Sequence, residues 1–373
     1  MSRLSVAAGV LFFLCVGFGY RLSSAKPLWN DEIYTQINSI DQASYKDIAL
    51  GRIREGNNCP LFYLIQKGIC DLTQYQFPLR WDKEWNLSDH KSQIIMRINS
   101  NIFMSASIAL IFYFFSRNYS IWAGVYSLLL SFSSFMVWAY WAEARPYALW
   151  VFLTTLQSVL FLGFIKQESD GQSHWRRLVI VSLLLSITVV FGAVQAAVML
   201  FLLAIFKKEK WLKCVILAGL AAGIALFYYL RSQGMKFWVE KDFFELITAS
   251  FSFDQMLILA VYAGFLGVRY FQKEGGVSMR LNPYFIFTLL MLMMAFLMLV
   301  ILHIISAGEQ AGFSVSDRYF IFLVPIGIIA ATLFSGELLR VAKGRRWLFA
   351  NLLIGLSGLL VIRFLKLIVK LIG

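Results

Sequence analysis

Long apolar stretches separated by short polar connections make up most of this chain. The first stretch covers Leu4 to Tyr20, and ten more follow residue 97. Because about 20 apolar residues cross a bilayer as a helix, the pattern predicts an all-α polytopic membrane protein with about eleven transmembrane helices. The later segments are Ile98–Phe115, Ile121–Trp141, Tyr147–Ile165, Leu178–Phe191, Val194–Phe206, Lys213–Leu230, Met256–Tyr270, Tyr284–Ile305, Tyr319–Phe334 and Trp347–Leu367.

Two regions of the chain have apolar runs whose length does not match a single span. The stretch from 178 to 206 is long for one span and short for two, and we divide it at Gly192 and Gln195. Residues 21–97 are polar and mixed, apart from an apolar run that begins at Pro60-Leu61. That run is too short to span, so we expect it to lie in the membrane interface within a structured loop.

Basic residues give the orientation. They concentrate in alternate connections, which the positive-inside rule assigns to the cytoplasm. The basic connections contain Arg117, Lys166, Arg176, Arg177, Lys207, Lys208, Lys210, Lys213, Arg269, Lys273, Arg280, Arg340, Lys343, Arg345 and Arg346. Loop 21–97 and the turns at 143–147 and 306–318 therefore share the external face. The bases after residue 360 fit this scheme poorly, which suggests that the last helix lies in the interface.

Composition agrees with a membrane protein. The 373 residues are 59% hydrophobic and 15% charged, with a mean hydropathy of +0.69, which excludes an ordinary soluble domain. The net charge of +13 is spread between apolar runs, so it indicates topology and contacts with anionic lipids rather than nucleic-acid binding. The three histidines and four cysteines have no zinc-ligand spacing, and Cys59 and Cys70 are expected to be buried and too far apart for a disulfide.

Three charged features fall on the predicted external face: Asp31-Glu32, the segment Glu143-Ala144-Arg145-Pro146-Tyr147, and Asp317-Arg318-Tyr319. Each has an ordinary structural explanation. Asn30 can cap a surface helix from Asp31 to Ile40, and the two arginines can snorkel beside local acids. A functional explanation also exists, because a guanidinium fork suits phosphate and adjacent carboxylates suit proton or metal chemistry.

Taken in order, these motifs resemble the GT-C glycosyltransferases of the protein O-mannosyltransferase and aminoarabinose-transferase type. The likeness rests on the acidic pair in a large first external loop, the Pro60-Leu61-Phe62-Tyr63 run, Glu-Ala-Arg-x-Tyr at the end of the third span, and Arg318-Tyr319 at a late span. It covers about the first 165 residues well, and the remainder through span pattern and Asp317-Arg318-Tyr319.

The resemblance implies a GT-C bundle forming one transferase domain over residues 1–373, with 21–97 as the external loop. Some relatives carry a large soluble domain after the last span, and the sequence here predicts none. The implied donor is a polyprenyl-phosphate sugar, transferred with inversion to a lipid, protein or glycan acceptor. Asp31 would be the general base and Glu32 would assist it. Arg145 would hold the phosphate with Glu143 orienting it, and Arg318 would also contact substrate. Tyr63, Tyr147 and Tyr319 are the candidate pocket walls.

The resemblance leaves cofactor use open. Relatives often carry His-Pro-Pro-Leu where this chain has Asn58-Cys59-Pro60-Leu61, so a histidine ligand is missing. A divalent cation would have to use Asp31 or Glu32. The small size suggests a bacterial inner membrane, with the active site outside. A retained first helix is preferred over a signal peptide cleaved near Ala25.

Two other classes compete with the transferase. A transporter or lipid flippase normally carries ionisable groups near the bilayer midplane and shows inverted repeats. Here the interiors of the spans are nearly uncharged and the acids lie at an aqueous edge. An inactive assembly subunit on a transferase scaffold is the third interpretation, and the presence of both Asp31 and Arg145 counts against it.

Overall fold

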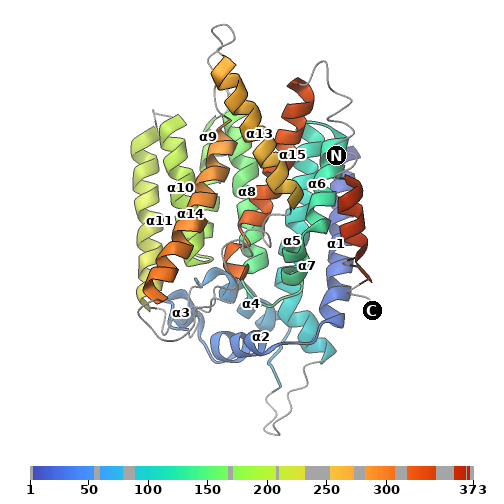
Figure 1. Cartoon of the computed structure of the whole chain (residues 1–373). Coiled ribbons are helices and arrows are strands. Elements are labelled where there is room, and N and C mark those ends of the chain that lie inside the picture. Colours follow the sequence, from blue (N-terminus) through green and yellow to red (C-terminus); the bar gives the residue numbers. More distant parts are fainter. Residues whose placement is uncertain are drawn as a thin grey trace. The chain divides into compact units, whose positions relative to one another are not determined.

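The computed structural model describes residues 3–53, 59–78, 89–166, 171–206, 210–231, 253–272, 282–306, 317–341, 357–366 and 368–369. All the secondary-structure elements in these ranges are helices (Figure 1). Five of these helices are long and apolar enough to cross a membrane: α1 (Arg3–Ala25), α5 (His90–Asn118), α8 (Tyr147–Lys166), α11 (Trp211–Arg231) and α15 (Leu323–Val341). The bent pair α6 (Ile121–Ser133) and α7 (Phe135–Trp141) can form a sixth span, with a 69° break. The chain is therefore an all-α, multi-pass membrane protein.

The remaining long helices overlap predicted apolar segments, although the first of them begins seven residues and ends five residues before the segment predicted at Leu178–Phe191. They are α9 (Gly171–Ser186), α10 (Val190–Phe206), α13 (Phe253–Gln272) and α14 (Pro283–Ser306). The last predicted segment, Trp347–Leu367, is described only at 357–366, which is helical. Because several of these helices have apolar parts shorter than a full span, the count of eleven stays a prediction.

The predicted division at Gly192 and Gln195 is wrong. The turn between the two helices lies at 187–189, so both residues belong to α10. A side chain at position 192 would begin 2.5 Å from the carbonyl oxygen of Leu185, so glycine there lets α10 start close against the end of α9. Gln195 does not break the helix because its amide is fully bonded inside the protein.

Gln195 is the centre of a buried polar network that joins α8 and α10. Its Oε1 accepts from Trp150 Nε1 at 3.1 Å and Thr154 Oγ1 at 3.2 Å, and its Nε2 donates to Gln157 Oε1 at 3.0 Å. Gln157 Nε2 in turn donates to Ser182 Oγ of α9 at 3.1 Å. The network satisfies polar groups that apolar packing would leave unbonded, and it ties three successive helices together.

Replacing Gln195 with leucine is expected to lower the free energy of unfolding by roughly 1–2 kcal/mol, because three partners lose a bond within the bundle. Thermal unfolding of the purified protein in detergent measures this loss. The control is Val194→Leu on the exposed side of α10, where Val194 is 40% exposed. Equal melting temperatures for the two variants would show that the network contributes nothing to stability.

The helices cluster into two compact units, which are described separately. Unit 1 comprises residues 1–8, 110–138 and 238–373, and unit 2 comprises residues 9–109 and 139–237. In unit 1, α15 packs on α6, α13 and α14. The ring of Phe334 stacks on Tyr262 with 4.1 Å between centroids, and Glu337 accepts from Tyr262 Oη and from Asn282 Nδ2.

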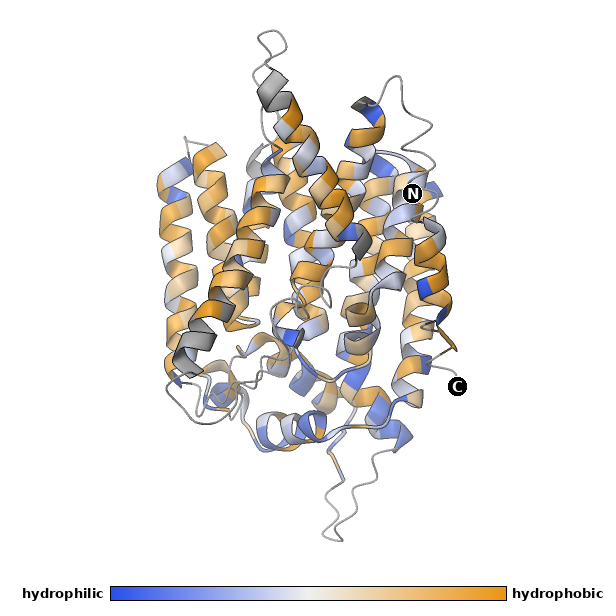
Figure 2. Ribbon diagram, viewed as in Figure 1, coloured by the Kyte–Doolittle hydropathy of each residue, from blue (hydrophilic) through white to orange (hydrophobic). Residues whose placement is uncertain are grey.

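Short helices gather at one end of unit 2 and contain most of its polar surface (Figures 1 and 2). They are α2 (Asn30–Thr35), the π-helix η1 (Gln36–Asp41), α3 (Tyr45–Ala49) and α4 (Leu61–Leu72). The apolar run after Pro60 forms α4, which packs on η1 and α3, and its place in the membrane interface stays a prediction. Gln66 of α4 donates to the carbonyl oxygen of Ile95 in α5 at 3.0 Å, so this layer is attached to a spanning helix.

Two further hydrogen bonds connect η1 internally and to the segment after α4. Asp41, at the end of η1, accepts from Gln36 Nε2 at 2.7 Å and from the backbone N–H of Phe77 at 3.0 Å. Burial raises the pKa of the Asp41 carboxyl, while these two hydrogen bonds oppose the rise. Cys59 and Cys70 are both buried and not disulfide-bonded, as predicted.

Candidate active site

A buried ion pair between Glu32 and Arg97 lies beneath α2, and both side chains are 0% exposed. Arg97 Nε donates to Glu32 Oε1 at 2.8 Å and Arg97 Nη2 donates to Glu32 Oε2 at 2.6 Å. The other guanidinium N–H groups donate to the carbonyl oxygens of Ser23, Lys26 and Pro27. All five donors of Arg97 are thus used, three of them on backbone oxygens at and after the end of α1.

Glu32 occupies the first turn of α2, where a carboxylate is favoured by the helix N-terminus. Its Oε2 accepts from the backbone N–H of Trp29 at 3.2 Å, which closes the start of the helix. Its Oε1 accepts from the backbone N–H of Ala144 at 2.8 Å. One carboxylate therefore fixes α2 to the turn at 143–145, more than a hundred residues away in sequence. Trp29, not Asn30, precedes the helix as its capping position, and α2 is half-buried rather than on the surface.

Arg145 extends from that turn to α2. Its Nη1 donates to Thr35 Oγ1 at 2.6 Å, and its side chain is buried, with the residue 8% exposed. The turn itself is tight, because the N–H of Arg145 donates to the carbonyl oxygen of Glu143 at 2.8 Å. Ser100 Oγ of α5 donates to the carbonyl oxygen of Arg145 at 3.3 Å, so the turn is held on two sides.

Asp31 lies on the same face of α2 as Thr35, because residues four apart are neighbours on a helix, with about 5–6 Å between Cβ atoms. Unlike Glu32, Asp31 is partly exposed. The predicted phosphate ligand Arg145 is thus bonded to Thr35, one helical turn after the predicted base Asp31 in unit 2.

Glu143 and Lys26 add charges to this end of unit 2. Glu143 is 4% exposed, and its Oε2 lies 3.9 Å from Lys26 Nζ. Lys26 Nζ also donates to the carbonyl oxygen of Ala139 at 3.2 Å, which secures the lysine above the end of α7. The turn at 143–145 therefore contains one acid, Glu143, and one base, Arg145, and Lys26 lies beside the acid.

The predicted pocket tyrosines of unit 2 lie in its interior. Tyr147, 2% exposed, packs edge-on against Tyr140 with 5.1 Å between ring centroids. Tyr63, 0% exposed, packs edge-on against Phe62 at 5.4 Å. Tyr147 begins α8 and Tyr63 lies in the first turn of α4, so their role as pocket walls stays a prediction.

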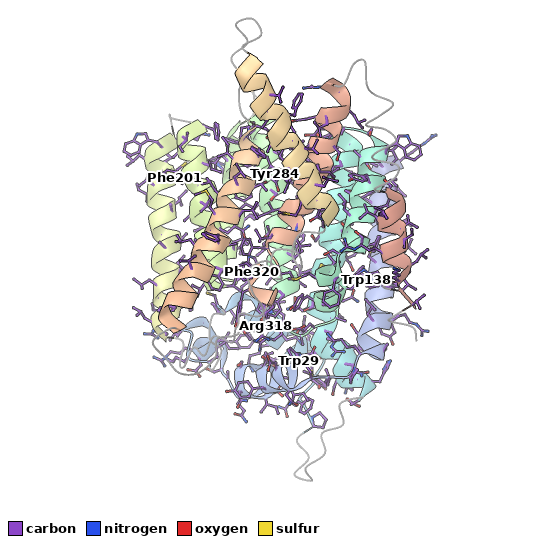
Figure 3. All side chains as sticks on the ribbon, in the orientation of Figure 1. Trp29, Trp138, Phe201, Tyr284, Arg318 and Phe320 are labelled. Atoms are coloured by element: carbon purple, nitrogen blue, oxygen red, sulfur yellow. The ribbon has the colours of Figure 1, made fainter. Side chains whose placement is uncertain are left out.

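Arg318 and Tyr319 belong to unit 1, in the 3₁₀ helix η3 (Asp317–Phe320) that leads into α15. The guanidinium of Arg318 lies over the ring of Tyr319 at 5.6 Å, a cation–π geometry. Figure 3 labels Arg318 and the buried Phe320 in this segment. Their contribution to a site with Asp31 stays a prediction.

The residues at α2 do not fit a divalent cation. Both oxygens of Glu32 already accept from Arg97, Ala144 and Trp29, which leaves Asp31 as the one partly exposed carboxylate of the pair. Within the described residues, no group of three or more His, Cys, Asp or Glu side chains is arranged to hold a metal ion.

Sequence reasoning missed Arg97, Thr35 and Lys26. In the hydrophobic pattern, Arg97 marks only the boundary between a polar loop and a span. One signal was available: an arginine at the start of a long apolar helix, with an acid far upstream, is a candidate for a buried pair. Thr35 gave no signal, because a threonine four residues after an acid has no distinctive pattern.

The fold and this site define a class: a multi-pass membrane protein with a polar, charge-bearing layer of short helices over one end of a helical unit. No family model matches the sequence, and no similar protein was found among curated proteins.

Proposed function

We propose that the chain is a GT-C type membrane glycosyltransferase that moves a sugar from a polyprenyl-phosphate donor to an acceptor. The observation that carries the proposal is the bond from Arg145 to Thr35, one helical turn after the partly exposed Asp31. A guanidinium fixed at α2 and a partly exposed carboxylate on the same helix supply the two kinds of group that a displacement at an anomeric carbon needs: a ligand for the leaving phosphate and a base for the acceptor.

The chemistry assigns one role to each group. Asp31 accepts the proton of the acceptor hydroxyl or amine as that atom forms its bond to the anomeric carbon. The bond from the anomeric carbon to the phosphate oxygen breaks on the opposite side, and its electron pair stays with the polyprenyl phosphate. Arg145 stabilises the negative charge that develops there. Attack from the side opposite the leaving group inverts the anomeric configuration.

The remaining charges have supporting roles. Glu32 and Arg97 position α2 and the 143–145 turn, so Glu32 acts as a positioning residue rather than as a group that touches the acceptor. Lys26 adds positive charge on the side where the phosphate would arrive, paired with Glu143. The positive-inside rule places this end of unit 2 outside the cytoplasm, which suits a lipid-linked donor presented at the external face of a bacterial inner membrane.

Binding measurements on Arg145→Ala test the proposal. The variant is expected to weaken binding of a short-chain polyprenyl-phosphate sugar by at least tenfold, because a charge-assisted hydrogen bond to phosphate is lost. The control is Arg21→Ala, an exposed arginine near the end of α1. Fluorescence-detected binding of the donor, with retention on size-exclusion chromatography, distinguishes loss of the ligand contact from loss of fold. Unchanged donor binding by a folded Arg145→Ala protein would reject the proposal.

A further inference from the structure

A groove with a volume of about 500 Å³ runs between α9 and α11 in unit 2. Its walls include Trp175, Arg176, Val179 and Ile180 from α9 and Lys213 and Ile216 from α11. These residues lie near the starts of two helices that run in the same direction, so the groove is at the end of unit 2 remote from α2. The positive-inside rule assigns that end to the cytoplasmic leaflet.

A basic residue from each helix lines the groove. Arg176 and Lys213 are both exposed at its wall. Lys210, the residue immediately before α11, lies over the rings of Trp175 at 5.1 Å and Phe164 at 5.3 Å, so a third cation lies against a residue of the groove wall. Neither α9 nor α11 contains an acidic residue.

The rest of the groove is aliphatic and faces outward. Only 11% of the spanning window of α11 is buried, and Ile216 is 61% exposed, as is expected of a helix that faces lipid. Figure 2 shows the apolar colouring along α10 and α11, and Figure 3 labels Phe201 on α10, which is 58% exposed. Basic side chains can bind the phosphate of a phospholipid, and an apolar groove that faces the bilayer can hold one of its acyl chains.

We propose that this groove binds one anionic phospholipid of the cytoplasmic leaflet, with its phosphate at Arg176 and Lys213 and an acyl chain along Val179, Ile180 and Ile216. The charge favours an anionic over a zwitterionic lipid, because two cations meet one net negative charge. The aliphatic walls favour a lipid over a free phosphate, which would leave them unused. The proposal does not depend on the proposed transferase activity.

Native mass spectrometry of the detergent-purified protein tests it, with phosphatidylglycerol and phosphatidylcholine added separately. The wild-type protein is expected to retain one phosphatidylglycerol in preference to phosphatidylcholine. The double variant Arg176→Gln/Lys213→Gln is expected to bind phosphatidylglycerol roughly 30-fold more weakly, the product of two contributions of about 1 kcal/mol each. Ile216→Trp, which fills the groove and keeps both charges, is expected to lose the retained lipid as well.

The matched control is Arg177→Gln/Arg21→Gln, which removes the same charge from exposed positions outside the groove. It is expected to bind like wild type. The proposal is overturned if the two double variants bind phosphatidylglycerol equally, if Ile216→Trp retains the lipid, or if wild type shows no preference over phosphatidylcholine. Each variant changes an exposed side chain, and the mass spectra report folded protein through its charge-state distribution.

Discussion

Replacing Arg97 with leucine is expected to destabilise the protein by about 3–5 kcal/mol, because it leaves the Glu32 carboxylate charged, buried and without its partner. The same change removes the donors to three carbonyl oxygens at the end of α1. The start of α2 and the turn at 144 both depend on Glu32, so they lose their common anchor. The yield of folded protein from membranes and its thermal unfolding temperature measure the effect.

An exposed ion pair in the same unit supplies the control. Arg52 Nη1 lies 3.8 Å from Asp47 Oδ1, with the side chains 55% and 41% exposed. Arg52→Leu is expected to cost less than about 1 kcal/mol, as surface pairs do. Arg97→Lys is expected to fall between the two, since an ammonium keeps the charge but not the fork. If Arg97→Leu and Arg52→Leu unfold at the same temperature, the Glu32–Arg97 pair does not hold this region.

Replacing Asp31 with asparagine is expected to reduce sugar transfer by about 10²–10⁴-fold, the usual contribution of a positioned general base. The amide is similar in size but does not accept a proton at neutral pH. Asp31 is partly exposed and is not part of the Glu32–Arg97 pair, so folded protein should be recovered at wild-type yield. Turnover is measured as release of polyprenyl phosphate from a synthetic donor in membranes containing the chain.

Asp47→Asn is the control for Asp31→Asn. Asp47 is a partly exposed acid in the same layer of short helices, bonded to Ser44 in the first turn of α3. It is expected to leave turnover unchanged. Wild-type turnover by Asp31→Asn would remove Asp31 from the mechanism. If Asp31→Asn binds the donor normally but has lost turnover, Asp31 is needed for the chemical step and not for donor binding, which is the role proposed for Arg145.

Much of this fold follows from the hydrophobic pattern, because a spanning helix needs an apolar run of fixed length. Segments such as Ile98–Phe115 and Tyr147–Ile165 coincide with parts of α5 and α8 for that reason. The turn between α9 and α10 was misplaced by several residues. Apolarity continues through it, and Gln195 is accommodated by partners on α8 that a local pattern does not reveal.

The sequence predicted part of the candidate site, namely that Asp31 and Arg145 share one face, but not which of the two adjacent acids is buried. Motif order and sidedness brought Asp31 and Arg145 to one face, and the structure places both in unit 2 beside Thr35. The distinction between Asp31 and Glu32 was not predictable, since adjacent acids on a helix point in different directions. Glu32 faces inward because a distant arginine, Arg97, is there to pair with it, and such pairing is a tertiary property.

The most direct test of the account is a cryo-EM structure of the purified chain with polyprenyl phosphate bound. The account predicts phosphate density bonded to the Arg145 guanidinium, on the side of α2 that carries Asp31 and Thr35. Phosphate density elsewhere, for example only at Arg176 and Lys213 in the groove between α9 and α11, would contradict a donor site at Arg145.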